Sequence, residues 1–286
     1  MILLTGITGN NGGATANALL DQGIKFRALV RDLDKAADWA AKGVELVQGD
    51  LNDANSIKAA LDGIDRAVLV LNNSQEQEKL ELQFIATAKQ AGLPWIIKLS
   101  SPEAVRGTTS PLPLAHIAAE DAIMESGMSW TFVRPSFFMQ NFRGSIPKAK
   151  ETGVLAMPMG ENGNAALTDC ADAGAFIAQI LTDDNSAQHF GQCYDITGPD
   201  PVMSFTEIAT QMGEAFGKEV KYMAVDPQKF QEIMRPFLSS DWHSNAVAHL
   251  FAEIADGTTP GIKTDTFEKV MGRSGRSFEE FLKSSV

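Results

Sequence analysis

Near its N-terminus the sequence reads Thr5-Gly6-Ile7-Thr8-Gly9-Asn10-Asn11-Gly12, directly after the apolar run Ile2-Leu3-Leu4. An apolar run, a glycine-rich turn and an alanine-rich segment in this order predict a strand, a phosphate-binding loop and a helix. Gly6 permits a sharp turn, Gly9 lets the backbone approach a pyrophosphate group, and Gly12 allows close helix packing. Backbone amides at the helix N-terminus then face the phosphates. The predicted dinucleotide contacts here are Gly6, Thr8, Gly9, Asn10, Asn11 and Gly12.

Short apolar runs alternate with helical patterns through the first half of the chain. The expected strands are Ile2–Thr5, Phe26–Val30, Val44–Val47, Ala67–Leu71, Trp95–Leu99 and Trp130–Val133. The expected helices are Gly12–Gln22, Lys35–Ala41, Ala54–Leu61, Glu76–Ala91 and Ala115–Ser126. The strands are densely apolar, as in a parallel sheet buried on both faces. The predicted fold class is therefore α/β, with a doubly wound parallel Rossmann sheet.

The pattern changes after about residue 150. Residues 153–163 are rich in Gly, Pro and Met and predict an irregular segment. Ser-x-x-Glu capping boxes at Ser204 and Ser277 predict two helix starts. Further helices are expected at Arg235–Ile254 and Asp265–Met271, and one more strand at Cys193–Thr197. The sequence thus predicts a dinucleotide-binding domain over residues 1–155, rejoined by a strand near 192–198. Residues 156–286 are expected to form a smaller, mostly helical substrate-binding lobe.

The second expected strand ends in Val30-Arg31-Asp32, about 20 residues after the glycine loop, where the ribose-reading side chain normally lies. Because Arg31 comes first and an arginine pairs with a 2′-phosphate, we predict NADP(H) as the preferred cofactor. Asp32 leaves NAD(H) possible. Asp50 and Leu51, at the end of the third strand, are expected near the adenine, although Asp50 also fits a plain helix-start acid. Asn72 and Asn73, which end the fourth strand, are expected to contact the nicotinamide ribose or to form only a turn, and Leu71 is a further expected cofactor contact.

The glycine spacing GxxGxxG is typical of the short-chain dehydrogenase/reductase superfamily. Further motifs resemble its NmrA-like branch: Leu29–Arg31, Gly49–Leu51, Leu99–Ser101, His116-Ile-Ala-Ala-Glu120 and Arg134-Pro-Ser-Phe-Phe-Met-Gln-Asn141. The resemblance covers roughly the first 145 residues and returns weakly at Asp195–Gly198 and near the C-terminus. It implies an atypical NAD(P)H-dependent reductase of quinones, azo dyes or triphenylmethane dyes. The same branch contains regulators that bind a dinucleotide without catalysis.

The usual catalytic Tyr-x-x-x-Lys pair of the superfamily is missing. Lysine in that pair lowers the tyrosine pKa so that the phenol exchanges a proton near neutral pH. Tyr194 and Tyr222 lie far downstream of the expected position, and neither has a lysine four residues on. At the position expected for that pair, after the fifth strand, the sequence reads His116-Ile117-Ala118-Ala119-Glu120. Alcohol oxidation by the usual mechanism and sugar-nucleotide epimerisation are therefore not expected.

His116 and Ser100 are the candidate catalytic residues. A histidine can carry a proton near pH 7, and Glu120, one helical turn on, lies on the same face and can orient it. An equally plain interpretation is that His116 contacts the nicotinamide ribose or a backbone carbonyl, or lies on the surface. Ser100 and Ser101 end a central strand, so their hydroxyls can meet the cofactor or only begin the next turn.

An apolar group follows the next strand, in Pro135-Ser-Phe-Phe-Met139. We predict cofactor contacts from Pro135 and Phe137, and a pocket for a planar substrate from Phe137, Phe138, Met139 and Met157. The alternative is that these side chains form core. His189, His243 and His249 lie apart, with no Cys or carboxylate at ligand spacing, so no metal site is expected.

The overall composition narrows the function classes further. A formal net charge of −12 disfavours direct nucleic-acid binding. No apolar run is long enough to cross a bilayer, and Cys170 and Cys193 form no CxxC pair, so a cytoplasmic protein is expected. Both a monomer and a homodimer are compatible with the sequence. The favoured function is NADPH-dependent transfer of hydride to a flat conjugated acceptor. The alternative is a non-catalytic, NAD(P)-binding redox sensor that reports to a protein partner.

Overall fold

The computed structural model describes residues 1–105, 107–234, 240–259 and 261–285. The chain forms two compact units that interleave along the sequence. The first, here called the sheet unit, comprises residues 1–101, 115–134 and 170–194. The second unit comprises residues 102–114, 135–169 and 195–286. The expected division had a boundary near residue 155 and a strand near 192–198 that rejoins the first domain. In the structure, residues 102–114 and 135–155 fall in the second unit and residues 170–194 in the sheet unit.

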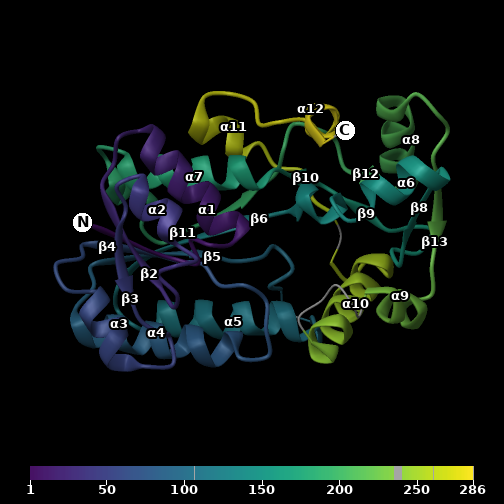
Figure 1. Ribbon diagram of the computed structural model, residues 1–286. Helices are drawn as coiled ribbons and strands as arrows, with labels where there is room; N and C mark the ends of the chain where they lie inside the picture. Colours follow the sequence, from purple (N-terminus) through teal and green to yellow (C-terminus); the bar gives the residue numbers. More distant parts are fainter. Residues whose placement is uncertain (106, 235–239, 260, 286) are drawn as a thin grey trace. The chain divides into compact units, whose positions relative to one another are not determined.

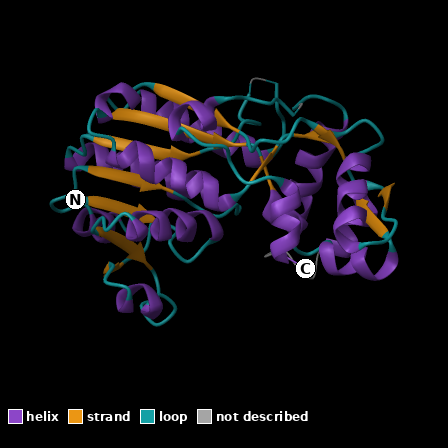
Figure 2. Ribbon diagram, turned by 90° about the horizontal axis from the view of Figure 1, so that it is seen from above, coloured by secondary structure: helices purple, strands orange, loops and turns teal. Residues whose placement is uncertain are grey.

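The described residues form a central sheet of seven strands in the order β11-β6-β5-β4-β1-β2-β3 (Figures 1 and 2). Its strands are β1 (Ile2–Thr5), β2 (Phe26–Val30), β3 (Glu45–Gln48), β4 (Arg66–Leu69), β5 (Trp95–Leu99), β6 (Ser129–Pro135) and β11 (Gln192–Ile196). Neighbours from β3 to β6 pair in parallel. The chain reverses its winding direction between β1 and β4, and ligands of such sheets bind at this point. The predicted Rossmann fold is confirmed.

Helices cover both faces of the sheet. They are α1 (Asn10–Asp21), α2 (Ala37–Ala41), α3 (Ala54–Ala60), α4 (Gln77–Ala91), α5 (Pro111–Met124) and α7 (Cys170–Thr182), with the short 3₁₀ turn η2 (Ser186–His189). In Figure 1, α1 and α7 lie on one face, and α3, α4 and α5 on the other. Gly174 of α7 faces α1 so closely that an added Cβ would lie 2.4 Å from the Ala14 carbonyl carbon.

The three most apolar strands match their predicted bounds: β1, β2 and β5. Helix α5 begins at Pro111, one turn earlier than the predicted Ala115, because proline is well accepted in the first turn of a helix. The predicted strand at Cys193–Thr197 is β11, shifted by one residue. Gly92 ends α4 in the left-handed conformation that glycine adopts readily after a helix.

The second unit combines helices with small sheets. Its elements are β7 (Phe137–Phe138), η1 (Met139–Phe142), α6 (Ile146–Thr152), β8 (Val154–Met157), β9 (Asn164–Ala165), β10 (Leu167–Thr168), β12 (Met203–Ser204), α8 (Phe205–Phe216), β13 (Lys221–Ala224), α9 (Pro227–Met234), α10 (Asp241–Ala255), α11 (Thr266–Met271) and α12 (Phe278–Ser285). The prediction that residues 153–163 are irregular was wrong in part. Residues 154–157 form β8, because the distant β13 supplies parallel hydrogen-bonding partners.

Both predicted capping boxes are confirmed. Ser204 and Glu207 bond each other's backbone at the start of α8, and Ser277 and Glu280 do the same before α12. The helix predicted over 235–254 is observed as α10 from Asp241, with Ser240 as its N-cap, and its part at 235–239 lies outside the described residues.

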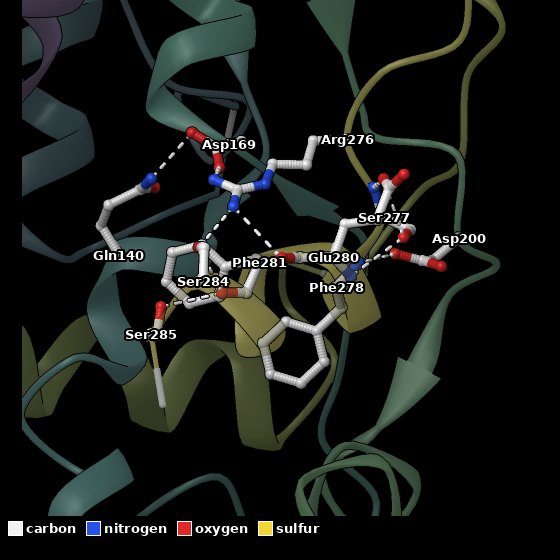
Figure 3. A network of polar contacts seen from close by, with 10 residues as sticks. All are labelled: Gln140, Asp169, Asp200, Arg276, Ser277, Phe278, Glu280, Phe281, Ser284 and Ser285. Atoms are coloured by element: carbon white, nitrogen blue, oxygen red, sulfur yellow. Dashed lines mark hydrogen bonds and ion pairs between the residues drawn. The ribbon is translucent and has the colours of Figure 1, made fainter. Parts of the chain in front are cut away.

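A buried carboxylate anchors α12 within the second unit (Figure 3). Asp169 is 1% exposed; one of its oxygens accepts from Gln140 Nε2 at 2.8 Å and the other from Arg276 Nη1 at 3.0 Å. Asp200 accepts the Phe278 amide at 2.7 Å, at the start of the helix. Phe278 and Phe281 then pack into the core of this unit. The chain end is thus tied down by charge-assisted bonds as well as apolar burial.

Candidate functional site

A cleft of about 610 Å³ lies at the carboxyl ends of β1 to β4. It lies wholly in the sheet unit, at the switch point of the strand order. The predicted contacts that line it are Gly6, Thr8, Arg31, Asp50, Leu51, Leu71 and Asn72. The Thr5 hydroxyl holds the end of β1 to the residue Val70 that follows β4. It donates to the Val70 carbonyl at 2.9 Å and accepts the Val70 amide at 2.8 Å. The glycine turn is therefore held against the end of β4.

The glycine loop is shaped by two close approaches. Gly6 has φ +68°, and a Cβ there would lie 2.5 Å from the Val70 carbonyl oxygen. A Cβ at Gly12 would lie 2.1 Å from the Gly6 carbonyl oxygen. Gly9 differs, because the nearest atom to its added Cβ, Asn72 Oδ1, is 3.1 Å away. Gly6 and Gly12 are thus required by the fold, whereas a side chain at Gly9 would displace only the end of the Asn72 side chain.

The N-terminus of α1 offers donors to an anion. Gly9 is its N-cap and supplies no side-chain cap, and Asn10 and Asn11 open its first turn. The Asn11 Oδ1 is buried and has no hydrogen-bond partner among the described residues. An uncapped 12-residue helix and an orphaned buried amide oxygen fit a bound diphosphate with its ribose. Asn73 is exposed next to Asn72, and its predicted contact remains a prediction.

The end of β2 carries the exposed cation Arg31. Arg31 is exposed, lines the cleft, and has no ion pair with any described residue. Asp32, the residue that favours NAD(H), is turned onto the backbone: its Oδ1 accepts the amides of Asp34 and Lys35 at 3.1 and 3.2 Å. These bonds hold the pKa of Asp32 below its ordinary value. Lys35, which the sequence analysis did not select, also lines the cleft and could have been found as a second base after this strand.

Asp50 follows β3 and is held in place by hydrogen bonds to residues of the loop and helix that come after it. Its Oδ1 accepts the Asn52 amide at 2.8 Å, and its backbone is bonded to the Ser56 hydroxyl. Asp53, not Asp50, is the N-cap of α3, so the helix-start interpretation of Asp50 does not apply. Asp50 and Leu51 both line the cleft, on the side expected for an adenine.

The candidate catalytic residues Ser100 and His116 both belong to the sheet unit. Ser100 directly follows β5, and His116 lies on α5. Ser100 is 7% exposed, and its Oγ has no partner among the described residues. His116 on α5 is half-buried, with an enclosed Nδ1 that likewise has no described partner. Burial, together with the nearby cations Lys98 and Arg134, holds the pKa of His116 well below its usual value. The imidazole is therefore neutral near pH 7.

Glu120 does not orient His116, contrary to expectation. Its carboxylate accepts from Arg134 instead, with Nε at 2.9 Å and Nη2 also in contact. This ion pair joins the His116–Glu120 motif to the Arg134–Asn141 motif, and the Glu120 side chain is 6% exposed. The pair therefore ties α5 to β6, and the Glu120 carboxylate is engaged by Arg134 instead of the His116 ring.

Comparison with known proteins identifies the family. The NmrA-like family model matches residues 1–282. This chain belongs to the NmrA-like family. It is 33% identical over 286 residues to an NAD(P)H azoreductase of Xenophilus azovorans, covering 99% of this chain and 97% of that one. It is 28% identical to quinone oxidoreductase 2 of Escherichia coli over 98% of this chain and 96% of that protein.

Solved structures of the NmrA-like family share the fold over the whole chain. The NADPH-dependent quinone oxidoreductase QOR2 of Escherichia coli, complexed with NADPH, superposes with a TM-score of 0.88 at 25% identity, covering 99% of both chains. A Citrobacter triphenylmethane reductase complexed with NADP(H) gives a TM-score of 0.88 at 23% identity over 100% of both chains, which shows the fold alone.

Neither tyrosine of this NmrA-like chain is set up as a proton donor. The Tyr222 hydroxyl donates to the carbonyls of Met157 and Gly160 at 3.1 and 2.9 Å, and burial raises its pKa to about 12. In the sheet unit, the Tyr194 hydroxyl lies 2.8 Å from His189 Nδ1, and burial raises its pKa too. A tuned phenol of the usual superfamily kind is absent from the described residues.

The predicted apolar pocket residues lie within the second unit. Phe137, Met139 and Met157 are 8%, 0% and 3% exposed and belong to its core cluster. Phe138 is half-buried, and Pro135 is buried at the end of β6. The predicted cofactor contacts that do not line the cleft of the sheet unit, and that remain predictions, include Ser100, Ser101, His116, Pro135 and Phe137.

Within the described ranges, no group of three His, Cys, Asp or Glu side chains is placed to hold a metal ion. No helix in the part of the chain that the structure describes is both long and apolar enough to cross a membrane.

The sequence analysis did not select Lys98 or Glu81. Their buried ion pair sets the charge near His116. A lysine inside the apolar strand Trp95-Ile-Ile-Lys-Leu was the available signal, because such a buried cation requires a partner.

Proposed function

We propose that this protein transfers hydride from NADPH to a flat, conjugated acceptor of the quinone, azo or triphenylmethane type. It is an NAD(P)H-dependent oxidoreductase, the activity class named for the azoreductase that it matches over 99% of its length. The acceptor type is the finer part of the proposal. It is supported by the names of the relatives and by the chemistry of the site.

The observation that carries the proposal is the unpaired Arg31 at the mouth of the cleft. One carboxylate oxygen of Asp32 accepts the amides of residues 34 and 35, and the other pairs with Lys35 Nζ at 3.6 Å, so Asp32 does not neutralise the Arg31 guanidinium. Arg31, with Lys35 on the same cleft, would hold a 2′-phosphate, and the α1 N-terminus would hold the diphosphate. The residues present thus fit NADPH.

When bound, NADPH would supply the hydride. The residues of the chain would position the cofactor and the acceptor and surround them with hydrogen-bonding groups. A conjugated acceptor spreads the arriving negative charge over its π system, so a tuned phenol is less necessary. The neutral His116 cannot act as a cationic acid, but it can donate or accept one hydrogen bond. The Ser100 hydroxyl, buried and without a described partner, would orient the ring that reacts.

Steady-state consumption of NADPH with a panel of small quinones, an azo dye and a triphenylmethane dye tests the proposal. We expect turnover with at least one acceptor and a lower Michaelis constant for NADPH than for NADH. NADPH binding by calorimetry without turnover of any acceptor would instead support the non-catalytic redox sensor. A variant that cannot bind the diphosphate, Gly9→Val, is the control for background reduction.

A further inference from the structure

A buried carboxylate on α10 receives several hydrogen bonds from one short segment of the second unit. Glu253 is 5% exposed. Its Oε1 accepts the amides of Thr109 and Ser110 at 2.7 and 3.0 Å and the Thr109 hydroxyl at 3.0 Å. Its Oε2 accepts the Thr108 hydroxyl at 2.6 Å. Residues 108–110 are therefore bound by a single side chain that is remote in sequence.

These hydrogen bonds require an ionised carboxylate. Burial raises the pKa of Glu253, but the bonds from Thr108, Thr109 and Ser110 outweigh burial and hold that pKa below its ordinary value. A neighbouring histidine completes the arrangement: His249 Nε2 lies 2.9 Å from Thr109 Oγ1. Because the single hydroxyl proton of Thr109 points to Glu253, the histidine is the donor to that oxygen.

The bound segment leads directly into α5. The Ser110 carbonyl accepts the Leu114 amide at 3.2 Å, which closes the first turn of that helix. Pro111 and Pro113 remove two amides from this turn, so the helix has few donors of its own to fix its start. A carboxylate beside the start of a helix is also favoured by the helix dipole. Glu253 thus determines where α5 begins.

Helix α5 is shared by the two units. Residues 111–114 belong to the second unit, and residues 115–124, which include His116, belong to the sheet unit. Because an α-helix is stiff, a shift or rotation of its first turn is passed on to His116, less than two turns along. The imidazole has no described partner for its Nδ1, so only the helix backbone and packing hold it in place.

We propose that Glu253 is a positioning residue for His116, acting through the start of α5. The inference rests on the proposed function only in giving His116 a cofactor contact. Loosening residues 108–110 would misplace the imidazole and weaken NADPH binding by about 3- to 10-fold, the worth of one ordinary hydrogen bond. The fold and the phosphate cleft, which lies in the sheet unit, would remain.

The test compares Glu253→Gln with Glu207→Gln in the full chain. Glu207 also bonds a helix start, as the capping-box residue of α8, and so controls for the loss of a helix cap. The first measurement is the NMR signal of the His116 ring without cofactor, assigned by its loss in His116→Ala. We expect a shifted or broadened His116 signal in Glu253→Gln and an unchanged one in Glu207→Gln. Amide hydrogen exchange should accelerate at Thr109 and Ser110 in Glu253→Gln only.

The second measurement is a double-mutant cycle on the dissociation constant of NADPH. Adding Glu253→Gln to His116→Ala should cost nothing further, because the two residues act as one unit. Additive losses, or an unchanged His116 signal in Glu253→Gln, would overturn the proposal. Should Glu253→Gln fold poorly, Thr108→Val is the second variant, since it removes one 2.6 Å bond and keeps the side-chain shape. Absence of turnover with every acceptor would contradict the proposed function alone, because both measurements are independent of catalysis.

Discussion

Lys98 Nζ lies 2.7 Å from both carboxylate oxygens of Glu81, and neither side chain is exposed to solvent. The pair links the middle of the sheet, at β5, to α4. A fully buried ion pair is expensive to desolvate, and well-packed apolar residues of similar size often replace it without loss of stability. The contribution of the Lys98–Glu81 pair to stability therefore has to be measured.

Removing one partner should be costly. Lys98→Met leaves an uncompensated buried carboxylate, so we expect a loss of about 3–5 kcal/mol in the free energy of unfolding, measured by urea denaturation. The double variant Lys98→Met/Glu81→Leu should recover most of that loss. Lys148→Met is the control, because Lys148 and its partner Glu151 are 69% and 71% exposed, and should change little. A single variant as stable as the control would contradict the burial of this pair.

Cofactor choice should depend on Arg31. Replacing it with alanine should weaken NADPH binding by about 1.5–3 kcal/mol, the range for a charged hydrogen bond, or roughly 10- to 150-fold. NADH lacks the 2′-phosphate, so its affinity should barely change. Calorimetry with both cofactors measures the difference. Equal losses for the two cofactors would remove Arg31 from the phosphate site, and wild-type preference for NADH would do the same.

The glycines of the phosphate loop should separate binding from folding. Gly12→Ala places a Cβ 2.1 Å from the Gly6 carbonyl oxygen, so the chain should lose stability strongly. Gly9→Val places its Cβ 3.1 Å from Asn72 Oδ1, which is the end of an exposed side chain that can shift, so the thermal midpoint should fall much less than in Gly12→Ala while NADPH binding collapses. Circular dichroism melting and calorimetry measure the two effects. Normal NADPH binding by Gly9→Val would show that the diphosphate lies elsewhere.

The bonds to Glu253 should appear in the pH dependence of stability. Its folded pKa lies below the ordinary 4.5, so its contribution is present above that value and is lost as the pH falls through the folded pKa. The stability difference between wild type and Glu253→Gln should therefore be largest near pH 6 and shrink below pH 4.5. Unfolding midpoints at several pH values measure it. A difference independent of pH would mean that the carboxylate carries no charge in the fold.

Local sequence was sufficient for the sheet and the phosphate loop. Dense apolar runs such as Trp95–Leu99 can only be buried strands, and the helix after Gly9 follows directly from its glycines. Pairing between distant segments was not accessible in the same way. Strand β8 forms because β13 pairs with it in parallel, and the sequence of residues 153–163 contains no signal that identifies this distant partner. Side-chain partners were missed for the same reason, as with Glu253 and Thr109.

His116 offers the most informative single test of the site. Its pKa is held well below the usual value by burial, Lys98 and Arg134, so it is neutral at working pH and cannot serve as a cationic acid. His116→Ala should therefore raise the Michaelis constant for NADPH while kcat changes by less than about 3-fold, the pattern of a lost binding contact. The rate of the wild type should show no inflection near the ordinary histidine pKa of about 6.5. General acid catalysis would instead lower kcat by about 100-fold or more. A loss of that size with unchanged NADPH affinity would make His116 the proton donor and overturn the neutral-contact assignment.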